Sequence, residues 1–178
     1  ERLTKLASHD SLTGLLNRRV FLEHANVAMK NYKRHQTPFA ILIIDVDDFK
    51  KINDYYGHDA GDKTLKKIVY FVRQSIRAND VAARFGGDEI IVCLTHVSEE
   101  EVKLVCDRLL ENIQGDVVME YNAIESTVSI GAALANPLDV YIDHVIKRAD
   151  DALYLAKNAG KNCYNIDATP VEAAVNII

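Results

Sequence analysis

The chain has 178 residues, enough for one domain with a substantial core and too few for two of ordinary size. Its formal net charge is −5 without a long basic run, which argues against binding to nucleic acid polymers, because that mode needs a dense cationic surface. The longest uninterrupted apolar stretch, residues 39–44, is too short to span a membrane.

The chain begins with Glu1 rather than Met, and its first residues resemble the end of a helix. We therefore expect a fragment in which residues 1–9 end an upstream linker helix, residues 10–168 form a domain and residues 169–178 form a C-terminal tail. The three cysteines, Cys93, Cys106 and Cys163, are odd in number and lack CxxC spacing. This pattern predicts core thiols rather than a disulfide framework or a zinc site.

The first half of the chain has clear periodic signals. Asn17 is expected to cap a helix that runs to about residue 32. Residues 39–45, an apolar run that ends at Asp45, are typical of a strand buried on both faces. Helical spacing continues over residues 59–78. Two short apolar segments then flank Gly86-Gly87, a pattern that predicts a β-hairpin with a two-residue turn.

In the second half, Ser98 and Glu101 match a capping box that begins another helix. Strands are expected at residues 117–121 and 126–134, a helix at 142–158 and an edge strand at 162–166. Without the outer helices, the order is β-α-β-β-α-β. This order predicts an α+β, ferredoxin-like fold with an antiparallel central sheet and helices on one face, a layout that polymerase palms and nucleotide cyclases share with many unrelated proteins.

A first acidic cluster, Asp45, Asp47 and Asp48, directly follows the buried strand. Acidic residues at this position are costly unless a cation compensates them. Hard oxygen ligands at a strand end suit Mg²⁺, which also bridges substrate phosphates. The alternative interpretation is a solvated loop or a group of acids at a helix N-terminus.

A second acidic pair, Asp88-Glu89, follows the two glycines of the hairpin. Glycines before the acids would let the backbone approach a ligand closely while both carboxylates are displayed. Because the hairpin should lie beside the first strand, Asp45 and Asp88 could share one metal ion. The alternative is an exposed, charged turn.

The third cluster combines lysines, glycines and polar side chains over residues 50–62. Glycine-rich turns beside a lysine suit phosphate groups. Asn53 and Asp62 supply the amide and carboxylate that a guanine edge requires. The same segment could equally be a capped turn before a helix.

Five segments together resemble the motifs of the GGDEF family of diguanylate cyclases, and the match covers nearly the whole chain. The segments are DSLTGLLNRR (10–19), DVDDFKKINDYYGHDAGD (45–62), RFGGDEI (84–90), SIG (129–131) and ADDALYLAK (149–157). Two positions depart from the family pattern. Ile90 stands where the signature usually has Phe, and Lys161 stands where Arg is usual, which removes the bidentate contact that Arg makes with phosphate.

The resemblance implies roles for the matching positions. Asp45, the carbonyl of Val46 and Asp88 would bind Mg²⁺, with Mn²⁺ as an alternative. Lys50 would stabilise charge on the transferred phosphoryl group. The general base would be Asp88 or Glu89, and the physical argument favours Glu89, because a metal-bound carboxylate is a poor proton acceptor. The other contacts with GTP would come from Phe49, Asn53, His58, Asp62, Lys157 and Lys161.

The implied reaction condenses two GTP into cyclic di-GMP and two pyrophosphates. A chain with one copy of each site would act as a homodimer, controlled by an upstream sensor or dimerisation domain. We expect a cytoplasmic domain that could belong to a membrane-anchored sensor protein. The main alternative is a module that binds GTP or cyclic di-GMP and regulates an attached domain such as a phosphodiesterase. A cyclase or polymerase palm of another family is the second alternative.

Arg77 and Asp80 match the RxxD motif that precedes the signature turn in many family members and binds the product as an inhibitor. Arg108, on the next predicted helix, could assist. The alternative is an arginine at a helix C-terminus followed by a capping aspartate.

Overall fold

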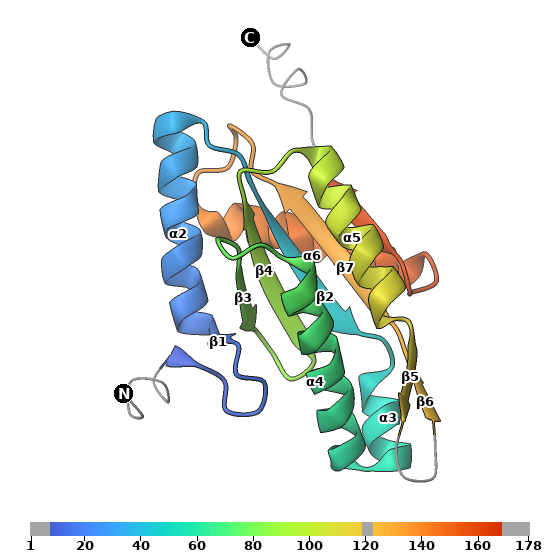
Figure 1. The fold of residues 1–178 in the computed structure, drawn as a ribbon. Helices are drawn as coiled ribbons and strands as arrows, with labels where there is room; N and C mark the ends of the chain where they lie inside the picture. Colours follow the sequence, from blue (N-terminus) through green and yellow to red (C-terminus); the bar gives the residue numbers. More distant parts are fainter. Residues whose placement is uncertain (1–7, 119–122, 169–178) are drawn as a thin grey trace.

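The computed structural model describes residues 8–118 and 123–168, which form a mixed six-stranded sheet with helices on both faces (Figure 1). Most of the expected linker helix, residues 1–7, and the whole expected tail, residues 169–178, lie outside the described residues. The elements in chain order are β1 (Leu16–Asn17), α2 (Arg18–His35), β2 (Phe39–Val46), α3 (Phe49–Tyr56), α4 (His58–Ser75), β3 (Val81–Arg84), β4 (Glu89–Thr95), α5 (Glu99–Ile113), β5 (Gly115–Val118), β6 (Ala123–Ser126), β7 (Val128–Leu134), α6 (Ile142–Asn158) and β8 (Tyr164–Asp167).

The strand order in the main sheet is β1-β3-β4-β2-β7-β8. The four inner strands, β3-β4-β2-β7, are antiparallel to their neighbours and have the predicted ferredoxin-like connectivity. β1 and β8 extend the sheet by parallel pairing at its two edges, so the complete sheet is mixed. The α+β prediction is confirmed, and β8 is an edge strand as expected.

Two hydrophobic layers explain why β2 is apolar at nearly every position. α4 and α5 cover one face of the sheet (Figure 1). Leu42 and Ile44 belong to the hydrophobic layer on this face. α2 and α6 cover the other face, where Ile41 and Ile43 point into the second layer. All residues of β2 are buried, because alternate side chains enter opposite layers. The two core helices share one face as predicted, and the outer helices cover the other.

Local sequence signals give several helix ends correctly. The Asn17 side chain accepts a hydrogen bond from the N–H of Val20, and Ser98 and Glu101 form the expected capping box. α6 spans the predicted residues. α4, in contrast, ends at Ser75 rather than at residue 78, because Ile76 is extended and the Asp80 carboxylate accepts the N–H of Arg77 in the following turn.

The hairpin between β3 and β4 is wider than the expected two-residue turn. β3 ends at Arg84 and β4 begins at Glu89, so residues 85–88 form the connection. Neither Gly86 nor Gly87 has the positive φ that a tight hairpin turn requires. The Arg84 guanidinium instead donates hydrogen bonds to both glycine carbonyls and holds a broader loop.

β5 and β6 form a separate antiparallel hairpin, which differs from the single strand expected at residues 117–121. Residues 119–122 lie outside the described part of the chain. β7 follows after a one-residue break at Thr127. In the described ranges, no helix is both long enough and apolar enough to cross a bilayer.

All three cysteines are free thiols as expected, but Cys163 is only half-buried and so is not the core thiol that was predicted. Cys93 and Cys106 are buried, and burial raises the pKa of each to about 12. Both therefore act as small apolar core residues.

Candidate active site

The register of the sheet brings the two acidic segments together. Asp45 on β2 pairs with Glu89 on β4, and the N–H of Val46 donates to the carbonyl of Asp88 at 3.3 Å. A cavity of about 350 Å³ opens at this end of the strands. Its lining residues are Asp45, Val46, Asp47, Asp48, Phe49, Lys50, Asp88, Lys157 and Lys161.

Asp45 is a buried carboxylate, with 7% of the residue exposed. The Lys157 ammonium lies 2.9 Å from Asp45 Oδ1. Burial is the main cause that raises the pKa of Asp45 to about 6; Lys157 offsets part of this effect, and the charges of Asp88 and Glu89 add to it. One lysine therefore compensates the buried charge only in part, as expected where another cation binds.

Asp48 is exposed and faces two lysines. Lys51 and Lys161 lie 2.8 Å and 2.9 Å from its carboxylate oxygens, and their hydrogen bonds hold the pKa of Asp48 below its usual value. Lys157 and Lys161 thus each bind an acid at the end of β2. Because both lysines are partly exposed, a triphosphate entering the cavity could draw them away from these acids.

The donor set of this cavity fits a Mg²⁺ ion that is completed by substrate. Within residues 8–118 and 123–168, no group of three or more acidic, histidine or cysteine side chains is arranged to hold a metal by itself. Asp45 and Asp88 do line one cavity, with the backbone of Val46 between them. Mg²⁺ is commonly held by one or two carboxylates together with waters and substrate phosphates, so two carboxylates are sufficient.

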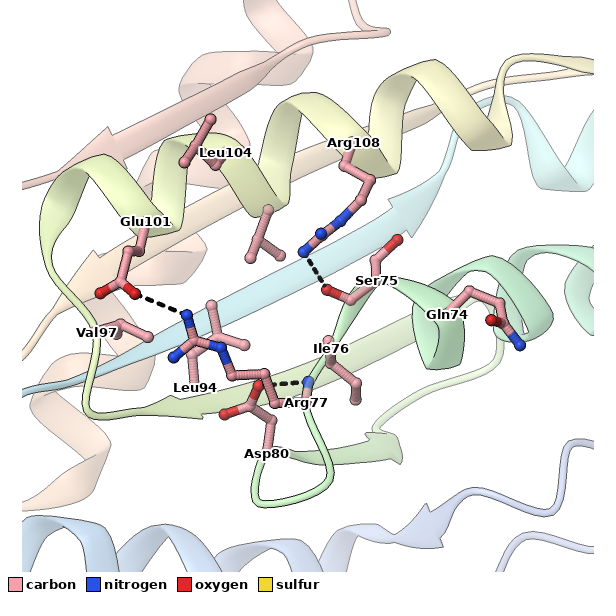
Figure 2. Close-up of a pocket in the computed structure, with 11 residues that line it drawn as sticks. Gln74, Ser75, Ile76, Arg77, Asp80, Leu94, Val97, Glu101, Leu104 and Arg108 are labelled. Carbon is pink, nitrogen blue, oxygen red and sulfur yellow. Dashed lines mark hydrogen bonds and ion pairs between the residues drawn. The ribbon is translucent and has the colours of Figure 1, made fainter.

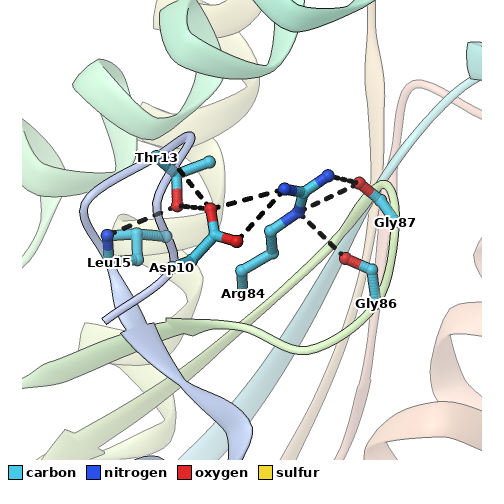
Figure 3. Close-up of polar contacts among 6 residues, drawn as sticks. All are labelled: Asp10, Thr13, Leu15, Arg84, Gly86 and Gly87. Atoms are coloured by element: carbon cyan, nitrogen blue, oxygen red, sulfur yellow. Dashed lines mark hydrogen bonds and ion pairs between the residues drawn. The ribbon is translucent and has the colours of Figure 1, made fainter. Parts of the chain in front are cut away.

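The loop of residues 85–88 between β3 and β4 is called the signature loop, and Figure 3 shows the contacts that hold it in place. The Arg84 guanidinium donates to the carbonyls of Gly86 and Gly87, at 2.7 Å for the shortest contact, and to both carboxylate oxygens of Asp10 at 3.2–3.3 Å. Thr13 donates to Asp10 through its N–H and its hydroxyl. Burial alone would raise the pKa of Asp10, but the Thr13 hydrogen bonds and the Arg84 charge together lower it.

Sequence reasoning missed this ion pair. Asp10 and Arg84 lie 74 residues apart, and each belongs to a different motif. Asp10 and Arg84 are both fixed positions of their motifs, and this was the only sequence feature that could have indicated a role for them. The pair connects the segment that enters the domain with the loop that carries Asp88 and Glu89.

Asp88 and Glu89 occupy different positions. Asp88 lines the cavity, whereas Glu89 is absent from its lining. A Cβ atom placed on Gly86 would lie 2.8 Å from Oε2 of Glu89, so this carboxylate folds back against the glycine loop. Asp88 therefore lines the cavity together with Asp45, whereas Glu89, although it pairs with Asp45 in the sheet, directs its carboxylate to the glycine loop.

The residues expected to contact guanine lie beside this cavity, on α3 and α4. A Cβ on Gly61 would come within 2.0 Å of Asn53 Oδ1, so the Asn53 amide packs directly on Gly61, next to Asp62. The Phe49 ring also contacts this spot and lines the cavity around Asp45, so it connects the two regions. His58 is exposed at the start of α4.

Arg77, Asp80 and Arg108 line a second cavity of about 210 Å³ between the end of α4 and α5 (Figure 2). The Arg77 guanidinium binds Glu101 at 2.7 Å, and Arg108 donates to the carbonyl of Ser75 at 2.6 Å. Asp80 accepts the N–H groups of Arg77 and Thr95, so it holds the turn after α4 rather than capping the helix as in the alternative interpretation. The structure thus brings all three predicted residues together.

Comparison with known proteins is consistent with this geometry. Over 155 residues, the chain is 39% identical to diguanylate cyclase DosC of Escherichia coli K12, covering 86% of this chain and 34% of DosC. It is 33% identical to the cyclic di-GMP phosphodiesterase NbdA of Pseudomonas aeruginosa, covering 90% of this chain and 20% of NbdA. The chain spans about a third of the length of the first curated relatives that it matches.

A solved structure also matches closely. The coiled coil and GGDEF domain of DgcB from Caulobacter crescentus, crystallised with c-di-GMP, superposes with a TM-score of 0.84 at 26% identity, covering 93% of this chain and 88% of that one. The family model described as "Diguanylate cyclase, GGDEF domain" matches residues 7–163. This match, together with the motifs and the arrangement of the site, establishes that the chain belongs to the GGDEF family.

Proposed function

We propose that this domain condenses two GTP molecules into cyclic di-GMP and two pyrophosphates in a Mg²⁺-dependent reaction. One observation carries the proposal. A single cavity collects four acidic residues, among them the pair Asp45 and Asp88, with the cations Lys50, Lys157 and Lys161, and Phe49 connects it to the Asn53 side chain. This combination suits a guanine nucleotide with a metal-bound triphosphate.

Different residues of the cavity bind the metal, bind the phosphates and stabilise the developing charge. Asp45, Asp88 and the carbonyl of Val46 hold Mg²⁺ or Mn²⁺, which neutralises charge on the phosphates when bound. When the nucleotide binds, Lys157 and Lys161 leave their ion pairs with Asp45 and Asp48 and bind the β- and γ-phosphates instead. Lys50 stabilises the negative charge that develops on the α-phosphoryl group.

The remaining side chains orient the nucleotide and remove a proton. Asn53 and Asp62 bind the guanine edge, with Phe49 and His58 beside the nucleotide. Asp88 or Glu89 accepts the proton of the attacking 3′-hydroxyl. Glu89 is the better candidate, because Asp88 lies with Asp45 at the metal-binding position and a metal-bound carboxylate is a weak base.

The direct test incubates the domain with GTP and Mg²⁺ and identifies the products by mass spectrometry. We expect cyclic di-GMP and pyrophosphate in a one-to-two ratio. ATP serves as the control and should not react, because adenine presents the opposite hydrogen-bonding groups to Asn53 and Asp62. Bound GTP that remains unreacted at high protein concentration would overturn the proposal.

The similarity to a part of NbdA favours one second candidate function. In that case the domain binds GTP or cyclic di-GMP and regulates an attached domain such as a phosphodiesterase. The same incubation separates the two candidates, since a regulatory module retains GTP unchanged. Intact Asp45, Asp88, Asn53 and Asp62 favour the cyclase.

We also propose that cyclic di-GMP binds at Arg77, Asp80 and Arg108 and inhibits the enzyme. Arg77→Ala is expected to leave the initial rate unchanged and to abolish the slowing that follows as product accumulates. The ion pair between Arg77 and Glu101 is exposed to solvent, which screens it, so its loss should affect stability little and the variant should fold normally. Progress curves with added cyclic di-GMP give the measurement.

Lys103→Ala is the matched control for Arg77→Ala. Lys103 is a cation on α5 whose partner is Glu99, and it is absent from the lining of the Arg77 cavity. The Lys103→Ala substitution removes one positive charge close to the proposed site, as Arg77→Ala does, and should leave product inhibition unchanged. Equal inhibition of wild type and Arg77→Ala would exclude this product site.

A further inference from the structure

Asp47 is one of three acids at the end of β2, with Asp45 and Asp48. It has no role in the proposed reaction, yet it accepts more hydrogen bonds than either of the other two. It is buried, with 7% of the residue exposed. Its Oδ2 accepts the hydroxyl of Thr127 at 2.7 Å and the main-chain N–H of Asn162 at 3.1 Å, and its Oδ1 accepts the hydroxyl of Ser129 at 2.6 Å. Asp47 therefore joins the end of β2 to β7 and to the turn between α6 and β8.

The turn that Asp47 holds has an unfavourable backbone. Gly160, Lys161 and Asn162 have φ values of 119°, 64° and 47°. Left-handed conformations cost free energy in residues other than glycine, and two such residues here follow one another. Contacts outside the turn must therefore maintain it, and the hydrogen bond from Asn162 N–H to Asp47 is such a contact.

The same turn places Lys161 at the candidate active site. Its ammonium lies 2.9 Å from Asp48 Oδ2 and lines the cavity. The Lys161 side chain extends from this turn towards the cavity. The position of its Cα atom therefore determines how far into the cavity the ammonium group can reach. We infer that Asp47 is a positioning residue that holds the 160–162 turn so that Lys161 meets the nucleotide phosphates.

This inference rests on the proposed function, in which Lys161 contacts the triphosphate. A carboxylate that only supported the sheet would act through Thr127 and Ser129 and would not affect Lys161 specifically. A carboxylate that acted by its charge would attract cations whatever the position of the turn. A double-mutant cycle together with an isosteric variant separates these three roles.

The experiment measures binding of a GTP analogue with a methylene group between the α- and β-phosphates, by calorimetry in Mg²⁺. The proteins are wild type, Asp47→Ala, Lys161→Ala and the double variant. We expect Asp47→Ala and Lys161→Ala each to weaken binding by ~10-fold, and Asp47→Ala to cost less than ~2-fold when Lys161 is already absent. Losses that multiply in the double variant would overturn the inference.

Asp47→Asn tests the role of charge. The amide oxygen can still accept Asn162 N–H and the Thr127 hydroxyl, while the amide NH₂ donates to Ser129, so the turn should keep its position. We expect analogue affinity within ~3-fold of wild type. A loss as large as that of Asp47→Ala would contradict positioning.

Thr127→Val controls for the contact on the sheet side, since it removes one hydrogen bond to Asp47 and leaves the Asn162 contact. It should retain near-normal affinity, and a loss equal to that of Asp47→Ala would favour a purely structural role. If Asp47→Ala does not fold, Asp47→Ser replaces it in the double-mutant cycle. The serine side chain is one bond shorter than that of aspartate, so its hydroxyl should not reach the N–H of Asn162. Steady-state kinetics should also show Asp47→Ala raising KM for GTP more than it lowers kcat.

The outcomes separate this inference from the proposed function. If wild type does not bind the analogue, or if Lys161→Ala binds it normally, the proposed role of Lys161 fails and the inference fails with it. If wild type and Lys161→Ala behave as proposed, but Asp47→Ala weakens analogue binding equally with and without Lys161, only the inference about Asp47 fails.

Discussion

Asp45→Asn is expected to abolish cyclase turnover and at the same time to stabilise the metal-free domain near neutral pH. Turnover is lost because the substitution removes an anionic ligand from the proposed Mg²⁺ site. Stability rises because the folded protein no longer buries a poorly compensated charge. Residues selected for catalysis often lower stability in this way. The released partner, Lys157, is 37% exposed and can be hydrated.

The stabilisation should depend on pH in a defined direction. Burial and the neighbouring acids raise the pKa of Asp45 from 3.8 to about 6, so above about pH 6 the folded wild type carries the full cost of the ionised carboxylate, ~2–3 kcal/mol. This cost is lost as the pH falls from about 6 towards 3.8, because wild-type Asp45 then takes up a proton. The amide introduced by the substitution does not titrate, so the difference between the proteins should disappear at low pH.

Thermal unfolding in EDTA at pH 8 and pH 4.5 measures this effect. We expect Asp45→Asn to melt roughly 4–8 °C above wild type at pH 8 and close to it at pH 4.5. Glu23→Gln is the matched carboxylate-to-amide control; Glu23 is exposed on α2 and pairs with Arg19. It should change neither activity nor the pH dependence. Near-normal turnover of Asp45→Asn at saturating Mg²⁺ would refute its assignment as a metal ligand.

Asp88→Asn gives an independent test of the shared metal. It should also abolish turnover, because Asp88, in the loop before β4, and Asp45, near the end of β2, line the same cavity. Mn²⁺ binding, measured by electron paramagnetic resonance in the presence of the unreactive GTP analogue, should weaken in both variants. Weakening in only one of them would mean that the two carboxylates do not share an ion.

The rate per molecule is expected to rise with protein concentration over a wide dilution series. Cyclic di-GMP contains two GMP units, whereas this chain has one Asn53–Asp62 pair and one Asp45–Asp88 pair. Each chain can therefore activate one GTP. In the proposed reaction, two chains would therefore face each other across a two-fold axis, so that each 3′-hydroxyl meets the α-phosphate held by the other chain.

A dimeric coiled coil fused ahead of Glu1 in a suitable register should remove most of this concentration dependence. Linking two chains gives an effective concentration in the millimolar range, so at submicromolar protein the rate per molecule should rise by ~10²-fold or more. The control carries the same coiled coil with charged residues at its core positions, which keeps it monomeric. A constant specific rate on dilution, with a monomer verified by light scattering, would rule out the two-chain mechanism.

Elements whose signals are local could be predicted from the sequence without any structure. The apolar run of β2, the Asn17 cap, the Ser98–Glu101 capping box and the periodicity of α6 all depend on residues a few positions apart. Such interactions form in the same way in almost any tertiary context. The order of these elements was sufficient to predict the ferredoxin-like core, and the motifs were sufficient to predict the family.

Which charged groups meet, in contrast, depends on how the elements pack. The pairs Asp10–Arg84, Asp45–Lys157 and Asp48–Lys161 each join distant segments, and the Asp47–Asn162 hydrogen bond links residues 115 positions apart. The width of the signature loop belongs to the same class, because it depends on contacts of Arg84 with the chain at Asp10 and at the glycines. These contacts follow from strand register and helix packing, which bring polar atoms within about 3 Å, whereas local patterns carry no information about distances between separate elements.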